Sequence, residues 1–335
     1  MPITLNPSNS DSKVFKVAAV QAEPEWLNLQ GSVDKTIRLI REASAQGAKI
    51  IGFPETFIPG YPWTPWANNY LVTAAVLKEY QANALAVHSP EMDRIREAVK
   101  EADITAVIGF SERDGASLYI SQATILPDGK IANHRRKIKI SQPTHYEKTV
   151  FGDGSAQSIY NVPWFKTHFY SQHPQIFVGS WWPAFAPGLG GSPYIVSGEA
   201  SSRMTQSVSI EGGCFGLACC HVVSEKGAEI MKMTGFPWFS FPGGGFTAIY
   251  GPDGSTLAQA DDPGVEQIVY ADISLNKIDE VKRVADITGN YSRMDLFHTV
   301  ADGKNWDAVE YGNSTEAQVS RERAGQIDNV ASGAY

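Results

Sequence analysis

The sequence runs twice through the same order of segments, and this repeat limits the folds that the chain can adopt. In each half, short runs of β-branched and apolar residues alternate with stretches of helical periodicity, and a hairpin follows. The hairpin turns fall at Asp128-Gly129 and Asp253-Gly254, and Asp-Gly between two strand-like runs is a strong hairpin signal. Strands that alternate with helices and end in hairpins predict an α/β sandwich, in which helices cover a mixed sheet.

Hydrophobic period and capping residues set the expected elements. Ser32 is expected to cap a helix with Val33, Ile37 and Ile40 on one face, and Gly47 follows its last turn. The predicted strands are 14–24, 49–55, 104–113, 175–182, 214–223 and 265–273, with hairpins at 117–137 and 248–260. Further helices are predicted at 69–86, 90–101 (opened by Ser89 and Pro90), 197–210 and 275–287.

Length and composition favour one globular unit. The chain has 335 residues, of which 43% are hydrophobic and 19% charged, so it can bury a sizeable core. No linker-like change of composition interrupts it. We therefore expect one domain over residues 14–300, a flexible N-terminal tail at 1–13 and a polar C-terminal tail at 301–335.

Charge, hydropathy and cysteine content narrow the class of partner. A net charge of −8 argues against a nucleic-acid surface, and no run of eighteen apolar residues is present to cross a membrane. The N-terminus lacks the apolar core of a secretory signal, and three cysteines fit a reducing compartment. The seven histidines show no zinc-type spacing. We expect a cytoplasmic protein that acts on a small molecule, without metal or other cofactor.

Glu55 is the first candidate for chemistry. It directly follows an apolar run and opens a turn rich in proline and glycine, in FPETFIPGYPW. A carboxylate at the C-terminal end of a buried strand can act as a general base, although a carboxylate that accepts loop N–H bonds is an equal alternative. The aromatic residues of the same turn, Tyr61, Trp63 and Trp66, are candidates either for an apolar pocket or for loop packing.

Basic residues gather at the end of a predicted strand, in HRRKIK at 134–139. Alternation places Lys137 and Lys139 on one face and Arg136 on the other. Such runs are usually solvated, but one lysine held inward would steady negative charge that develops in a reaction. Glu147 follows in PTHYEKTVFGDG, just before a glycine-rich turn, where a structural role in the loop is the usual explanation.

All three cysteines lie in the apolar segment CFGLACCHVV, as Cys214, Cys219 and Cys220. Cysteine is among the most buried residue types, so this segment is expected to be core. Cys220 and His221 are neighbours, and neighbours on a strand point to opposite faces. They are therefore not expected to form a catalytic Cys–His pair.

Seven segments, taken in order, resemble the nitrilase family of carbon–nitrogen hydrolases. They are VAAVQAEP, FPETFIPGYPW, HRRKIK, PTHYEKTVFGDG, the helix of SGEASSR, IYGPDGS and NYSRMDLF. The likeness extends from Lys16 to Val300 and is strongest to the branch that holds arylacetonitrilases and cyanide hydratases. It implies an αββα sandwich that pairs into a four-layered homodimer and extends to higher homo-oligomers.

The resemblance also implies a Glu–Lys–Cys active site with a second glutamate. By motif match, Glu55 is the general base, Lys137 is the catalytic lysine with Lys139 as the alternative, and Glu147 is the second glutamate. In the family reaction, a thiolate attacks a nitrile carbon to form a thioimidate. Water then releases ammonia and leaves a thioester, and a second water releases the carboxylic acid.

The family's nucleophile, the cysteine of a Cys-Trp-Glu elbow, has no match in this sequence. The elbow belongs between the FGDG loop and QIFVGSWW, where a strand, an elbow and a helix need about 30 residues. Only about 20 residues separate Gly154 from Gln175. We therefore predict that one central strand and most of the next helix are deleted near Phe165–Lys166. Three extra residues, Ile140-Ser141-Gln142, also interrupt the family pattern, and together the departures resemble misplaced splice boundaries.

Four hypotheses remain. The preferred one is a nitrilase whose sequence here is a misspliced version. The alternatives are an inactive pseudoenzyme that acts as a binding or assembly subunit, a substitute nucleophile at Cys219 or Cys220, and an amidase, which the GYPW turn disfavours. Because a lost strand leaves unpaired edges and a cavity beside Glu55, we expect a protein of low stability or solubility.

Overall fold

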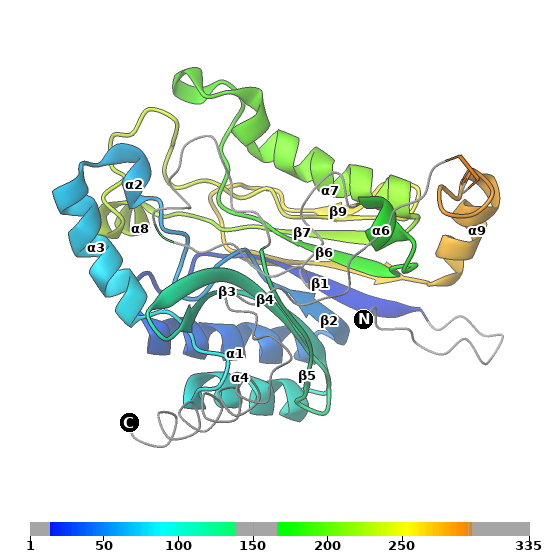
Figure 1. Cartoon of the computed structure of the whole chain (residues 1–335), viewed down its shortest axis with the longest axis horizontal. Helices are drawn as coiled ribbons and strands as arrows, with labels where there is room; N and C mark the ends of the chain where they lie inside the picture. The colour runs from blue at the N-terminus through cyan, green and yellow to red at the C-terminus, as the bar shows by residue number, and fades with distance from the viewer. Residues whose placement is uncertain (1–13, 138–149, 151–165, 294, 297–335) are drawn as a thin grey trace, which may run out of the picture.

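Two β-sheets lie face to face between two layers of helices (Figure 1). The structure, a computed structural model, describes residues 14–137, 150, 166–293 and 295–296. The two predicted tails, Lys139, Ile140-Ser141-Gln142, Glu147 and one side of the predicted deletion at Phe165 lie outside the described residues.

Sheet A has six strands in the order β10-β1-β2-β3-β4-β5. Strands β1, β2 and β3 run parallel, whereas β4, β5 and β10 pair antiparallel with their neighbours. Sheet B has the order β6-β7-β8-β9, in which β6 and β7 are parallel and the rest antiparallel. The bounds are β1 Phe15–Gln21, β2 Ala48–Gly52, β3 Thr105–Asp114, β4 Ser117–Ile125, β5 Ile131–Arg136, β6 Ile176–Ser180, β7 Phe215–Cys219, β8 Ala248–Tyr250, β9 Thr256–Gln259 and β10 Gln267–Ile273.

Helices cover the outer face of each sheet. Figure 1 shows α1 and α4 on the far side of sheet A and α7 on the far side of sheet B. The bounds are α1 Leu29–Ala45, α2 Thr64–Ala67, α3 Tyr70–Ala82, α4 Pro90–Glu101, α6 Lys166–Tyr170, α7 Gly198–Gly212, α8 Glu225–Ile230 and α9 Asn276–Val284. Among the described residues, no helix combines the length and the apolar character that a bilayer crossing requires.

The core forms in separate layers because each sheet has two buried faces. One apolar cluster fills the space between α1, α4 and sheet A, and includes Ile40, Ile51 and Ile95. A second fills the space between the sheets, with Val17 of β1 against Leu217 of β7. The predicted αββα sandwich is therefore confirmed, and the strand and hairpin predictions match within a few residues.

The predicted start of the first helix is wrong. The helix begins at Leu29 rather than after Ser32, because the side chain of Asn28 accepts a hydrogen bond from the Gly31 N–H. Ser32 instead lies inside the helix, where its hydroxyl donates to the Glu25 carbonyl at 2.9 Å. The predicted cap at Ser89 is confirmed, since its side chain accepts from the Met92 N–H.

Sheet B repeats part of sheet A. The succession β6-β7-β8-β9 has the same strand directions as β2-β3-β4-β5, namely one parallel pair followed by two antiparallel pairs. Within the described residues, β6 pairs with β7 alone, so no counterpart of β1 lies beside it. The five-residue α6 stands before β6 where the 17-residue α1 stands before β2. The predicted loss of a strand and a helix agrees with this arrangement and stays a prediction.

A glycine in β3 makes room for the turn that carries Glu55. A Cβ atom at Gly109 would lie 2.1 Å from the Pro54 carbonyl oxygen, so no side chain fits there. The Phe57 N–H donates to the Gly109 carbonyl at 2.9 Å, which fixes the turn against β3. The absent side chain of Gly109 therefore sets how closely the Glu55 segment approaches the sheet.

Gly109→Ala should lower the free energy of unfolding by about 2–3 kcal/mol, because the new methyl group must displace the backbone before Glu55. Gly47→Ala is the matched control: nothing lies within 4 Å of its added methyl, and it bears only the strain of a positive φ, about 1 kcal/mol. Urea titration of both variants measures the difference. Equal losses would show that the approach of Pro54 to β3 is not tight.

Candidate active site

Glu55 and Lys137 meet in a buried ion pair. Glu55 follows the end of β2. Lys137, 82 residues later in the sequence, follows the end of β5. Lys137 Nζ lies 3.0 Å from Glu55 Oε1, and their side chains are only 13% and 10% exposed. The structure therefore brings together two of the three residues that the sequence singled out. The third, Glu147, lies outside the described residues.

The backbone of Glu55 is held by sheet B. Its N–H donates to the Trp181 carbonyl at 3.2 Å, just beyond β6. Its carbonyl accepts from His221 Nε2 at 2.5 Å, just beyond β7, and from the Thr56 hydroxyl at 2.8 Å. Both backbone groups of the carboxylate-bearing residue are thus satisfied, and the position of Glu55 depends on the packing of both sheets.

Lys137 is the inward-facing lysine of the basic run. Its backbone N–H donates to the Ile120 carbonyl at 2.7 Å, which extends the pairing of β5 with β4 by one residue. His134 and Arg136 both contact the carboxylate of Glu112, and Arg135 donates to the side chain of Gln122. The predicted alternation of Arg136 and Lys137 is therefore confirmed, and these basic residues form specific contacts.

Glu112 carries its charge inside the protein. Burial acts to raise the pKa of this carboxyl group, but hydrogen bonds from His134, Arg136 and Ser121 outweigh it and hold the pKa at about 2. The Ser121 hydroxyl donates to Glu112 at 2.5 Å. The carboxylate therefore stays ionised at neutral and mildly acidic pH.

His221 is a buried neutral imidazole under the Glu55 turn. Its ring packs against Trp26 and Phe57, with centroid distances of 6.0 and 5.9 Å. Burial lowers the pKa of His221 to about 4, although the hydrogen bond to the Glu55 carbonyl acts in the opposite direction. Its other nitrogen, Nδ1, is buried and has no hydrogen-bond partner among the described residues.

No cysteine thiol is exposed. Cys214, Cys219 and Cys220 are each 0% exposed, and burial raises the pKa of Cys214 and of Cys220 to about 12 and that of Cys219 further. The Cys220 sulfur lies 3.1 Å from the Thr247 hydroxyl and accepts from the Phe246 N–H. Since nucleophilic attack requires an accessible thiolate, this burial argues against the substitute-nucleophile hypothesis.

The structure confirms that Cys220 and His221 diverge, since the thiol contacts Thr247 while the imidazole reaches Glu55. Sequence reasoning missed His221 and Glu112 as supports of the site. Their only signals were position: His221 lies two residues after a buried strand, and Glu112 follows the apolar part of β3. Among the described residues, no group of three or more potential ligands gathers around one point as a metal site would require.

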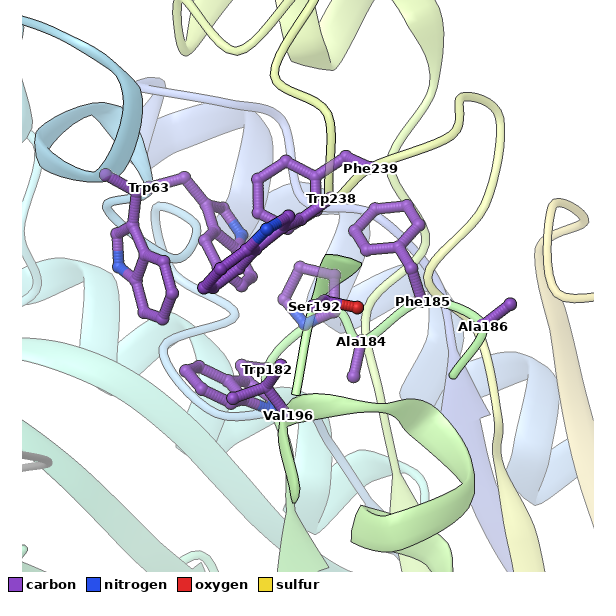
Figure 2. A pocket seen from close by; sticks show the side chains of 11 residues that line it. Trp63, Trp182, Ala184, Phe185, Ala186, Ser192, Val196, Trp238 and Phe239 are labelled. Carbon is purple, nitrogen blue, oxygen red and sulfur yellow. The ribbon is translucent and has the colours of Figure 1, made fainter. Parts of the chain in front are cut away.

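The aromatic turn after Glu55 borders a small hollow that is partly open to solvent. Trp63 and Trp66 line it together with Trp182 and Trp238, and Figure 2 shows the rings of Trp63, Trp182 and Trp238 around the same space. Tyr61 is 1% exposed and packs against Trp63 with ring centroids 4.8 Å apart. Trp63 and Trp66 thus border the hollow while they pack against other rings, Tyr61 packs in the loop, and the pocket interpretation stays a prediction.

Comparison with known proteins identifies the family of this chain. The sequence profile of the carbon-nitrogen hydrolase family matches residues 16–283. The chain belongs to this family. A cyanide hydratase of Armillaria gallica is 68% identical over 352 aligned positions, which cover 99% of the chain and 98% of that protein. A nitrilase of Talaromyces marneffei is 44% identical, over 85% of the chain and 94% of that protein.

Solved structures of the family's superfamily share the fold. An amidase from a Nesterenkonia species superposes with a TM-score of 0.55 at 16% identity, over 82% of the chain and 97% of that protein.

The alignment with the cyanide hydratase is longer than this chain. Because it spans 352 positions and the chain has 335 residues, at least 17 of its positions face no residue of this chain.

Breaking the buried ion pair on one side should cost more than removing both charges. Lys137→Met should lower the free energy of unfolding by about 3 kcal/mol, because it removes the cation that lies 3.0 Å from the buried Glu55 carboxylate. Combined with Glu55→Gln, the same change should cost clearly less. Denaturant titration of the two single variants and the double variant tests this, and strictly additive losses would contradict the coupling.

Acid should destabilise the protein in two steps. The folded-state pKa of His221 is about 4, below the 6.5 of a free histidine, so stability is full above pH 6.5 and falls as the pH drops toward 4, by up to about 3 kcal/mol. A second loss should follow between pH 4.5 and 2, as Glu112 is protonated. Denaturant titrations at each pH measure both steps. In His221→Gln the first step should vanish, and an unchanged slope would sink the assignment.

Proposed function

We propose that this chain derives from an enzyme that hydrolyses a nitrile to the carboxylic acid and ammonia through a cysteine thioimidate and thioester. The single observation that carries the proposal is the buried Glu55–Lys137 pair, with Nζ and Oε1 3.0 Å apart at the ends of two strands. Glu55 is assigned as the general base, Lys137 as the cation that steadies developing negative charge, and Glu147 as the second, assisting glutamate.

Each role follows from the position of the group. Glu55 is an acceptor next to a cation, so it can take the proton of a thiol as sulfur bonds to the nitrile carbon and one carbon–nitrogen bond opens. The nitrogen then bears negative charge, which the Lys137 ammonium stabilises at short range in a site shielded from water. Glu55 passes that proton to the nitrogen, which gives the neutral thioimidate and restores the carboxylate. Glu55 can then accept a proton from the water that adds to the thioimidate carbon and pass it to the nitrogen, so that ammonia leaves and a thioester remains, which a second water hydrolyses to the acid and the free thiol.

Similarity favours nitriles over other substrates. The relatives that cover most of the chain are a cyanide hydratase at 68% identity and a nitrilase at 44%. The amidase shares only 16% identity, so its likeness supports the fold and not the substrate. We extend the proposal to a small-molecule nitrile as the partner, a homodimer that extends to higher oligomers, and a cytoplasmic location.

We further propose that the segment with the nucleophile is absent from this chain. Three observations support this: no Cys-Trp-Glu occurs in the sequence, all three thiols are fully buried, and among the described residues no strand pairs with β6 in the place that β1 takes beside β2. At least 17 positions of the cyanide hydratase alignment have no counterpart here. Splicing error and true loss both produce this pattern.

The second candidate is an inactive subunit that binds or assembles without turnover. The burial of Cys214, Cys219 and Cys220 is the observation that favours it, because it leaves no accessible thiol near Glu55 among the described residues. The two candidates differ at the transcript. Sequencing it between the codons of Lys137 and Trp182 should reveal a block that encodes Cys-Trp-Glu if the parent is an active nitrilase.

The 335-residue chain should form no formamide from potassium cyanide. It should also release no ammonia from phenylacetonitrile. A repaired chain that carries the missing residues of the cyanide hydratase before Lys166 should convert at least one of these nitriles. Ammonia detection and formamide detection together cover both product types. Release of either product by the unrepaired chain would contradict the loss of the nucleophile.

The controls separate the parts of the proposal. Changing the grafted cysteine to alanine should abolish turnover, and Glu55→Gln in the repaired chain should do the same. A repaired chain that folds and hydrolyses amides but no nitrile would overturn the assignment of the substrate class. Thermal melting of each variant verifies that loss of turnover is not loss of fold.

A further inference from the structure

The basic run before Lys137 is organised around one buried carboxylate. Glu112 of β3 has a side chain that is 4% exposed, and it receives bonds from two residues of β5. His134 Nε2 lies 2.8 Å from it, while Arg136 donates through Nε at 3.0 Å and through Nη2 at 2.5 Å. Two hydrogen bonds from one guanidinium group to one carboxylate fix the orientation of the two groups as well as their separation.

These contacts lie on the face of sheet A opposite to Lys137. Register pairs Ser121 of β4 with Arg136 of β5, so both side chains project from the same face, and Ser121 also bonds Glu112. The Arg136 guanidinium lies 3.8 Å from the ring centre of Tyr119. Side chains alternate along a strand, so Lys137 projects from the other face, where it meets Glu55.

The place of β5 makes such an anchor necessary. Within the described residues, β5 is an edge strand that pairs with β4 alone, and its last residue is Arg136. The end of an edge strand opens readily because few backbone bonds hold it. Lys137 directly follows this strand end, so opening of the strand end would displace its backbone and free the amine to leave Glu55.

We propose that Glu112 is a positioning residue: it clamps the end of β5 through His134 and Arg136, and so holds the Lys137 amine against Glu55. The inference rests on the proposed function for its view of Lys137 as a catalytic group. A stabilising role alone explains the cluster less well. Buried ion pairs often add no more stability than apolar residues of the same size, whereas they do fix one geometry.

The test measures the reactivity of individual lysines and needs no turnover. The 335-residue chain is treated with a limiting amount of acetic anhydride, and the acetylation rate of Lys137 is read by mass spectrometry against Lys130, whose side chain is 77% exposed. In Glu112→Gln, Lys137 should react about tenfold faster, the factor that corresponds to about 1.4 kcal/mol for a lost charge-assisted bond. Lys130 should react at an unchanged rate.

A double variant links the effect to Glu55. In a Glu55→Gln background the ion pair that the clamp would hold is absent, so adding Glu112→Gln should change the Lys137 rate by less than about twofold. Asp114→Asn is the matched control, because Asp114 also bonds Arg136 but is 61% exposed, and it should leave the Lys137 rate near that of the parent.

The proposal is overturned if Glu112→Gln lowers the melting temperature but leaves the Lys137 rate unchanged, or if its effect is equally large without Glu55. Should Glu112→Gln fail to fold, Arg136→Gln gives the same comparison, since it keeps the carboxylate with His134 and Ser121. Failure of the repaired chain to hydrolyse nitriles would count against the proposed function and leave these rates as they are, so the two ideas fail separately.

Discussion

The buried Glu55–Lys137 ion pair is the interaction on which the rest of the site depends. Moving a carboxylate and an ammonium out of water costs several kcal/mol per ion, and their attraction offsets this only when the geometry is fixed. The surrounding structure supplies that geometry from two directions. Sheet B holds the backbone of Glu55 through Trp181 and His221, and Glu112 holds the strand that carries Lys137.

The geometry of the site therefore depends on both sheets of the sandwich and not on one sheet alone. The carboxylate and the ammonium both come from sheet A, yet the two backbone bonds of Glu55 that cross the molecule end on loops after β6 and β7. The Ser180 hydroxyl, which donates to the Phe53 carbonyl at 2.7 Å, adds a third link between the sheets. Loosening the contact between the sheets would therefore displace the base before it unfolded either sheet.

Local sequence patterns predicted the strands, hairpins and helix starts that neighbouring residues determine. Alternation and the Asp-Gly turns gave the strands and hairpins, and Ser89 and Ser197 marked helix starts correctly. The first helix shows the limit: Ser32 and Asn28 are both good caps, and only the path of the chain before Leu29 decides between them. Its position after an apolar run made Glu55 a candidate, and the resemblance assigned the roles of Glu55 and Lys137. His221 escaped because its role is a side-chain bond to a backbone carbonyl 166 positions away, which no spacing rule encodes.

The repeat within the fold explains where a nucleophile would have to lie. Sheet B matches β2 to β5 strand for strand, so a counterpart of β1 would run parallel to β6 on the side away from β7. Neighbouring strands lie about 4.8 Å apart, so the C-terminal end of such a strand would come one spacing from the end of β6. The residue after that end is Trp181, whose carbonyl accepts a hydrogen bond from the Glu55 N–H. If such a strand exists in the parent protein, a cysteine directly after it would lie near the base. Cys219, by contrast, ends β7 on the other side of β6, Cys220 follows it, and both are fully buried.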